Sequence, residues 1–124
     1  MSVSDDDFKT KIIKRLQQRA SSLDERHAAK ERIEREKTAL AQAERDGRRD
    51  DIYHHLVNIG TCYSVLKELH ETTEFFRRAV KEFPDRRYAL YVLVMALTYL
   101  GEREEAGKYA LLYEQRFPPK YPGK

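Results

Sequence analysis

Three histidines and one cysteine lie near one another in the middle of the chain and could, by residue type, bind a metal ion. They are His54, His55, Cys62 and His70. Imidazole and thiolate are the usual protein ligands of zinc. On a helix, however, adjacent side chains such as those of His54 and His55 point about 100° apart. No two of the four residues have the four-residue spacing that lets two ligands meet one ion. The sequence therefore predicts no metal site and no cofactor.

Cys62 would need a base and an orienting group to act as a nucleophile. His55 or His70 could be nominated as the base, but nothing in their spacing argues for it. A lone cysteine within a helix is usually a small apolar filler. Gly-rich loops that bind phosphate are absent from the sequence. We therefore expect that the protein is not an enzyme.

Three pairs of adjacent arginines could contact the phosphates of nucleic acid, with tyrosines as stacking surfaces. The pairs are Arg48 with Arg49, Arg77 with Arg78, and Arg86 with Arg87. Acidic residues flank each pair, and the 24 Lys and Arg of the chain nearly cancel its 21 Asp and Glu. Ordinary surface charge is therefore the favoured interpretation. An RNA-associated factor remains an alternative.

The composition indicates one folded domain in a reducing compartment. A chain of 124 residues with 40% hydrophobic content can close a modest core. The single cysteine excludes an internal disulfide framework. No apolar run approaches the roughly 18 residues of a membrane span, and the N-terminal MSVSDDDF is acidic, unlike a signal peptide. We expect a cytoplasmic protein that does not contact a membrane.

The elements that position these residues begin with a charged N-terminal segment, residues 1–50. It holds 13 Lys or Arg, 11 Asp or Glu, and only one of the 13 aromatic residues. Two helices are predicted there, over residues 5–20 and 23–46. The first has an apolar stripe of Phe8, Ile12, Leu16 and Ala20. The second has a thin stripe of Ala29, Ile33, Leu40 and Ala43. Ion pairs such as Glu31 with Arg35 should support the second helix, which Gly47 should end.

A repeat of 34 residues follows the seam at residues 46–51. Placing residues 53–86 over 87–120 aligns Leu56 with Leu90, Ile59 with Leu93, Leu66 with Leu100, Phe83 with Phe117 and Pro84 with Pro118. Each proline directly follows a predicted helix, which it cannot continue. Asp50 and Asp85 stand where helix caps are expected.

This pattern resembles the tetratricopeptide repeat (TPR) family, in which each repeat is a pair of helices. In the first copy the family positions hold Leu56, Ile59, Gly60, Tyr63, Thr72, Phe76, Ala79 and Pro84. In the second copy they hold Leu90, Leu93, Val94, Leu97, Ala106, Ala110, Tyr113 and Pro118. Gly60 should let the second helix approach closely, whereas Val94 replaces it in the second copy. Gly101 is expected at the turn of the second pair.

We therefore predict an all-α, TPR-like α-solenoid of about six helices. Its parts are a charged N-terminal helical hairpin (1–50), two repeats (51–118) and a flexible tail (119–124). About three repeats are normally needed for stability. Our hypothesis is that the N-terminal hairpin stands in for a third repeat. The alternative is a structural homo-oligomer joined through residues 5–46.

The resemblance implies a concave groove, lined by the first helix of each repeat, that binds a partner. By analogy the groove residues are His54, Val57, Asn58, Thr61, Ser64, Tyr88, Tyr91, Val92, Met95 and Thr98. Tyrosines and an adaptable methionine suit a peptide or helix with apolar side chains. Equally, Tyr91, Met95 and Tyr99 could pack on another helix of the same chain, with the stripe at residues 8–16 as one candidate.

Some TPR proteins bind the C-terminal carboxylate of chaperone peptides through Lys and Asn of the first helix. Val57 and Thr61 occupy those positions here, so chaperone tails are not predicted partners. The expected function is protein interaction, as an adaptor, scaffold or assembly helper. The identity of the partner is left open.

Overall fold

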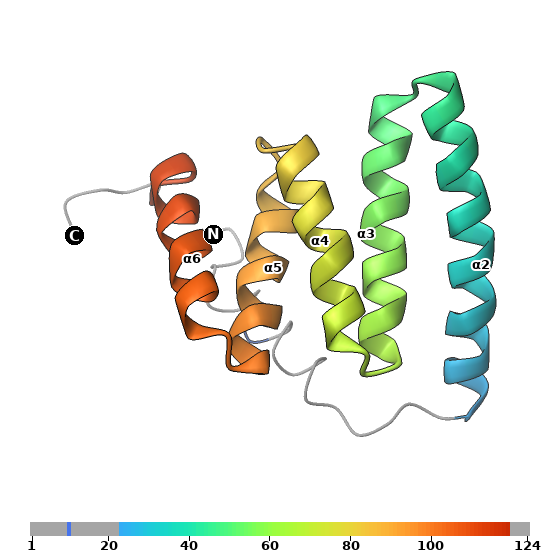
Figure 1. Cartoon of the computed structure of the whole chain (residues 1–124), viewed down its shortest axis with the longest axis horizontal. Helices are drawn as coiled ribbons and strands as arrows, with labels where there is room; N and C mark the ends of the chain where they lie inside the picture. The colour runs from blue at the N-terminus through green and yellow to red at the C-terminus, as the bar shows by residue number, and fades with distance from the viewer. Residues whose placement is uncertain (1–9, 11–22, 120–124) are drawn as a thin grey trace, which may run out of the picture.

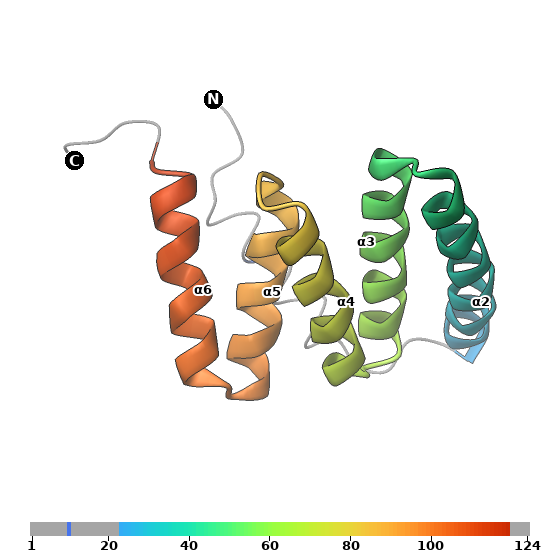
Figure 2. The ribbon, with the colours of Figure 1, turned by 45° about the horizontal axis from the view of Figure 1, so that its top comes forward.

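The computed structural model describes residue 10 and residues 23–119, and within them the chain forms five α-helices and no strands. The helices are α2 (Leu23–Asp46), α3 (Arg49–Val65), α4 (Leu69–Glu82), α5 (Arg87–Leu100) and α6 (Arg103–Arg116). Each helix runs antiparallel to the one before it, and all five stand side by side in chain order (Figure 1; Figure 2). The predicted all-α fold of helical hairpins is therefore confirmed. The helix predicted over residues 5–20 and its apolar stripe lie outside the described residues.

Helix α2 has the bounds that the sequence predicted, and its thin apolar stripe is buried. The four buried residues of α2 are Ala29, Ile33, Leu40 and Ala43. They join the core that also contains the buried side of α3. Gly47, with a φ of 68°, follows the helix as predicted. Oε2 of Glu31 lies 3.3 Å from Nε2 of His27, so the predicted pairing of Glu31 with Arg35 is not the one observed.

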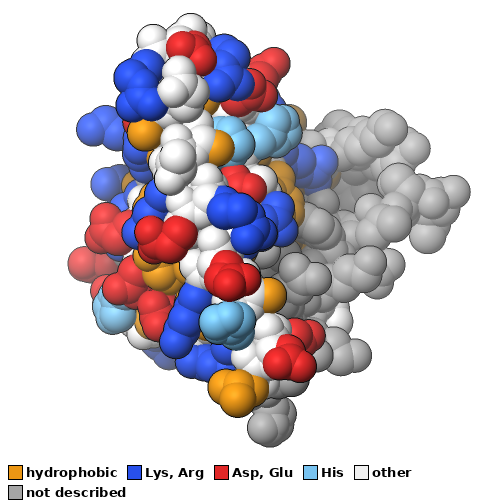
Figure 3. All heavy atoms as spheres, turned by 90° about the vertical axis from the view of Figure 1, so that its right-hand side faces the viewer, with side chains coloured by type: hydrophobic (Ala, Val, Ile, Leu, Met, Phe, Trp, Pro, Cys, Tyr) orange, Lys and Arg blue, Asp and Glu red, His pale blue; other side chains and the backbone are white. Residues whose placement is uncertain are grey.

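The outward face of α2 closes its end of the stack with polar side chains. Figure 3 shows Lys and Arg mixed with Asp and Glu over this face. An apolar stripe on one side and mixed charge on the other is what an end helix requires, because only one of its faces has a neighbour.

The hairpins α3–α4 and α5–α6 repeat their backbone geometry at a spacing of 34 residues. Lys67 and Gly101 both adopt a positive φ, of 64° and 83°. Phe83 and Phe117 end α4 and α6 with nearly the same dihedral angles, φ of −133° and −130° and ψ of 67° and 68°. The repeat visible in the side chains is therefore also a repeat of turns and helix ends.

Gly60 permits a close approach of α4 to α3 within the first hairpin, as predicted. A β-carbon at this position would lie 2.6 Å from Cε2 of Phe76, whose side chain is 1% exposed. One helical turn before Phe76, the fully buried hydroxyl of Thr72 donates hydrogen bonds of 3.2 Å to the carbonyl oxygens of Gly60 and Glu68. The ring and the hydroxyl therefore fix how α4 lies on α3.

The expected aspartate caps are wrong. Helix α3 begins at Arg49, with Arg48 as the N-cap residue, so Asp50 lies inside the first turn. Helix α5 has Arg86 at its N-cap, one residue after Asp85, and neither of these caps donates or accepts a side-chain capping bond. Asp50 instead accepts a 2.6 Å hydrogen bond from Arg86, which ties the start of α3 to the start of α5.

Helix α5 lies between α4 and α6 and is apolar around most of its surface. Eight of its 14 residues are buried, and Arg87, at its first position, is its only charged residue. A helix with neighbours on several sides needs apolar residues all round, which explains this composition. In the part of the chain that the structure describes, no helix combines the length and the apolar character needed to cross a membrane.

Candidate functional site

The histidines and Cys62 are placed apart by the helices, not gathered around one point. His54 and His70 are exposed, whereas His55 is half-buried and Cys62 is buried. Among residues 23–119, no group of three or more His, Cys, Asp or Glu is arranged to hold a metal ion.

His55 joins α3 to α2 through a carboxylate. Its Nδ1 atom lies 2.7 Å from Oε1 of Glu36. Burial raises the pKa of Glu36, but hydrogen bonds from His55 and Asn58 and the positive charges of His55 and Arg32 outweigh it, so the pKa lies below its usual value. This pair is a contact between two packed helices, which gives His55 a structural role.

Cys62 is 6% exposed and belongs to the core. Burial raises the pKa of its thiol, with smaller effects from charged residues of α2. A thiol kept protonated is a poor nucleophile, because the thiolate is the reactive form. The position therefore suits the apolar role expected from the sequence.

The arginine pairs are engaged within the chain. Arg48 bonds to Asp51, and Arg49 donates to the carbonyl oxygen of Glu82. The guanidinium of Arg77 makes a bidentate ion pair with the carboxylate of Glu105, with hydrogen bonds of 2.7 and 2.8 Å.

The other three arginines also have partners from different helices. Arg78 contacts Glu44 and Glu82, and Arg87 donates a 2.6 Å hydrogen bond to the hydroxyl of Tyr113. Arg86, besides its bond to α3, lies over the ring of Tyr53 at 4.4 Å. Contacts between helices occupy much of the hydrogen-bonding capacity that nucleic-acid phosphates would require.

The ten predicted groove residues differ widely in exposure. His54 and Thr98 are exposed. Half-buried are Val57, Asn58, Thr61 and Tyr88. Buried are Ser64, Tyr91, Val92 and Met95. An accessible surface for a partner is therefore found mainly at the α3 part of the set.

Tyr91 and Met95 form a small cluster with Leu69 of α4. The ring of Tyr91 also lies 5.6 Å from the ring of Tyr113 on α6. Tyr99, by contrast, is 46% exposed. In the folded chain Tyr91 and Met95 thus contact other helices of the same chain, as the packing interpretation expects. Their contact with a partner stays a prediction.

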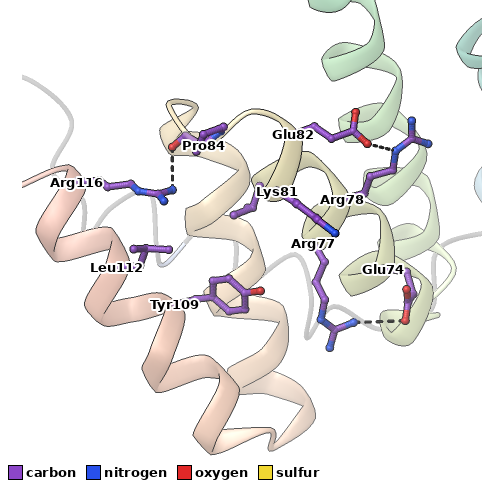
Figure 4. Close-up of a pocket in the computed structure, with 10 residues that line it drawn as sticks. Glu74, Arg77, Arg78, Lys81, Glu82, Pro84, Tyr109, Leu112 and Arg116 are labelled. Atoms are coloured by element: carbon purple, nitrogen blue, oxygen red, sulfur yellow. Dashed lines mark hydrogen bonds and ion pairs between the residues drawn. The ribbon is translucent and has the colours of Figure 1, made fainter. Parts of the chain in front are cut away.

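A groove that the sequence did not reveal lies between α4 and α6 (Figure 4). It has a volume of about 710 Å³. Its lining residues are Glu74, Arg77, Arg78, Val80, Lys81, Glu82, Pro84, Tyr109, Leu112 and Arg116. The sequence contains one indication of this groove. Where the first repeat has the charged Arg78, the second repeat has the apolar Leu112. The resemblance places the partner groove on the first helix of each repeat, so the sequence predicts no apolar groove between the second helices.

These features define an all-α stack of helical hairpins in which His55 and each arginine pair contact another helix and Cys62 lies in the core. No family model, curated protein or solved structure matches the chain. The resemblance to the TPR family therefore rests on the residues and their 34-residue spacing.

Proposed function

We propose that the protein is a TPR-like interaction module that binds a segment of another protein, as an adaptor, scaffold or assembly helper. The observation that supports this most is the repetition of helical hairpins with period 34, down to the dihedral angles that end α4 and α6. Stacked hairpins create long continuous faces, and such faces suit the binding of extended or helical peptides.

The same proposal gives the protein no catalytic step. His55 is held by Glu36, and the Cys62 thiol is buried with a raised pKa. A partner would lie along the accessible part of the face formed by α3 and α5, at His54, Val57 and Thr61. A cytoplasmic location, expected from the single cysteine, belongs to this proposal as well.

Quantitative affinity capture from the native cell tests the proposal. The intact chain is compared with a double variant, His54→Glu and Thr61→Glu. A control pair, Ala28→Glu and Thr38→Glu, changes exposed positions of α2. We expect at least one protein to be captured by the intact chain and the control but lost with the α3 variant.

Melting curves of both variants establish that they are folded. If the intact chain retains nothing beyond what an unrelated bait of equal charge retains, the module does not work by protein binding. Equal capture by all three forms would place the binding surface elsewhere on the chain.

A further inference from the structure

The groove between α4 and α6 lies on a different set of helices from the proposed partner face on α3 and α5. Figure 4 looks into it, with α6 forming one wall and α4 the other. Arg77 spans the groove at one end by bonding to Glu105 of α6. At the other end Arg116 of α6 donates a 3.1 Å hydrogen bond to the carbonyl oxygen of Pro84. The two contacts link the walls of the groove near its two ends.

The middle of the groove is apolar. Val80 is 6% exposed, Tyr109 and Leu112 are half-buried, and Pro84 is exposed. Tyr109 and Leu112 lie three residues apart on α6, so they share one face of that helix. Such a strip between two walls can accept one or two apolar side chains of a partner, whereas a purely ionic ligand would leave it uncovered.

The charged residues of the groove divide into two groups. Arg77 and Arg78 each contact two glutamates, Arg77 with Glu74 and Glu105, and Arg78 with Glu44 and Glu82. Their charge is therefore neutralised within the chain.

Lys81 and Arg116 differ from that first group. The side chain of Lys81 is exposed, and its ammonium group makes no hydrogen bond or ion pair with the described residues. Arg116 is exposed too, and its guanidinium donates to a neutral carbonyl oxygen, so its charge is not balanced. The hydroxyl of Tyr109 points across the groove in Figure 4. Among residues 23–119 it has no hydrogen-bond partner. All three groups are donors, and two of them are cationic.

A partner that complements this arrangement supplies carboxylates beside an apolar side chain. We propose that the α4–α6 groove binds an acidic protein segment, with an apolar side chain over Tyr109 and Leu112 and carboxylates at Lys81 and Arg116. Nucleic acid fits less well, because two unbalanced cations neutralise few phosphates and the apolar strip would stay uncovered. The proposal concerns a second surface and does not depend on the face of α3 and α5.

Selection from a phage library of random peptides tests the groove directly. The immobilised intact chain is the bait, and the double variant Lys81→Glu and Arg116→Glu is used for counter-selection. We expect the surviving peptides to combine Asp or Glu with Leu, Ile, Val or Phe. Because both charges that face the carboxylates are reversed, synthetic copies should bind the variant about ten-fold more weakly or worse.

Three controls make the result decisive. Lys30→Glu with Arg35→Glu makes the same charge change at two exposed positions of α2 and should leave binding unaltered. Lys81→Gln with Arg116→Gln removes the charges without reversing them, and it decides the outcome if the Glu variant melts early. A fluorescent oligonucleotide of mixed sequence should not compete with the selected peptide.

Enrichment of basic or uncharged peptides, failure to enrich any peptide sensitive to the groove variants, or competition by the oligonucleotide would overturn the proposal. A parallel selection without the counter-selection step covers the remaining outcome. If its peptides bind the groove variants as tightly as the intact chain but lose binding with His54→Glu and Thr61→Glu, the groove alone is refuted. In that case the proposed function on α3 and α5 would still stand.

Discussion

The contact between Gly60 and Phe76 makes a quantitative prediction for the addition of one methyl group. Gly60→Ala places a β-carbon 2.6 Å from Cε2 and 2.8 Å from Cδ2 of the Phe76 ring. Favourable contacts between carbon atoms occur at about 3.5–4.0 Å, so the ring or the helix has to move by about 1 Å. Phe76 is 1% exposed and the neighbouring Thr72 is fully buried, so the ring is surrounded by protein and cannot swing out into solvent.

Two opposing contributions determine the size of the effect. Overpacking a well-filled core costs about 1–3 kcal/mol. Replacing glycine by alanine inside a helix recovers about 0.5–1 kcal/mol, because alanine loses less conformational freedom on folding. The overpacking cost is the larger, so we expect Gly60→Ala to lower the free energy of unfolding by about 1–2 kcal/mol. That change corresponds to a factor of about 5–30 in the folding equilibrium.

Gly107→Ala is the matched control, because its β-carbon would meet nothing within 4 Å beyond the adjacent residues and backbone of its own helix. This variant, inside α6, should gain about 0.5–1 kcal/mol. Urea denaturation followed by circular dichroism gives both free energies, provided that the slope of the transition is unchanged. The two variants should move the midpoint in opposite directions.

A double-mutant cycle then assigns the cost to the ring. Phe76→Leu removes ring atoms, so its own cost should be smaller in the Gly60→Ala background than in the original chain, by about 0.5 kcal/mol or more. Equal stabilisation by Gly60→Ala and Gly107→Ala, or an additive cycle, would refute the close approach of α3 and α4 at Gly60.

Three further predictions follow from the turns, the α2–α3 contact and the thiol. Lys67→Gly should raise the free energy of unfolding by about 0.5–1 kcal/mol, because φ is 64° at this position and glycine adopts a positive φ at little cost. Gly101→Ala should lower the free energy of unfolding by about 1 kcal/mol, because φ is 83° there. If urea denaturation shows that both variants change stability in the same direction, the two turns are not matched. The pKa of Glu36 is lowered on folding, so its contribution to stability is present above about pH 4.5 and is lost as the pH falls through the folded value. Denaturation curves between pH 3 and 6 should show a smaller pH dependence for Glu36→Gln than for Glu34→Gln, and identical curves would contradict the assignment. The Cys62 thiol should react slowly with a soluble disulfide reagent until denaturant unfolds the chain, and fast labelling of the native protein would show that it is accessible.

Much of the fold could be predicted because the repeat combines strong local signals. The stripe of α2 is thin, yet its four apolar positions recur at helical spacing, and all four are buried. Gly47 and Gly101 mark helix ends because a positive φ costs them little. The position of Lys67 carries no such signal, because its left-handed conformation is imposed by the hairpin and is not indicated by the residue.

The helix starts were predicted less well, because an aspartate near a helix start can serve more than one purpose. Asp50 accepts from Arg86 of a later helix start, and that contact depends on how α3 and α5 are arranged in space. Local spacing contains no information about it. Local spacing predicts a cap at Asp50, whereas its carboxylate makes a tertiary contact.

Predicting the candidate site from the repeat pattern alone has a similar limit. Analogy placed Tyr91 and Met95 on a binding face, but burial depends on every neighbour of α5, and both side chains are 7% exposed. The α4–α6 groove depends on charges that are neutralised across helices, such as Arg77 by Glu105. Which arginines are balanced and which are not becomes visible only once the helices are placed.

The most direct test of the stacked-hairpin architecture is a nuclear Overhauser spectrum of the intact protein that links each helix to the next through an aromatic ring. We expect cross-peaks from Lys37 to Tyr63, from the α-protons of Gly60 to Phe76, from Phe76 to Tyr88 and from Tyr91 to Tyr113. Together they connect α2 to α3, α3 to α4, α4 to α5 and α5 to α6. Observation of all four is the result predicted by successive hairpins in one stack. If the Gly60–Phe76 cross-peak and at least one of the other three cross-peaks are both missing, in a protein that is otherwise helical, the stacked-hairpin architecture is contradicted.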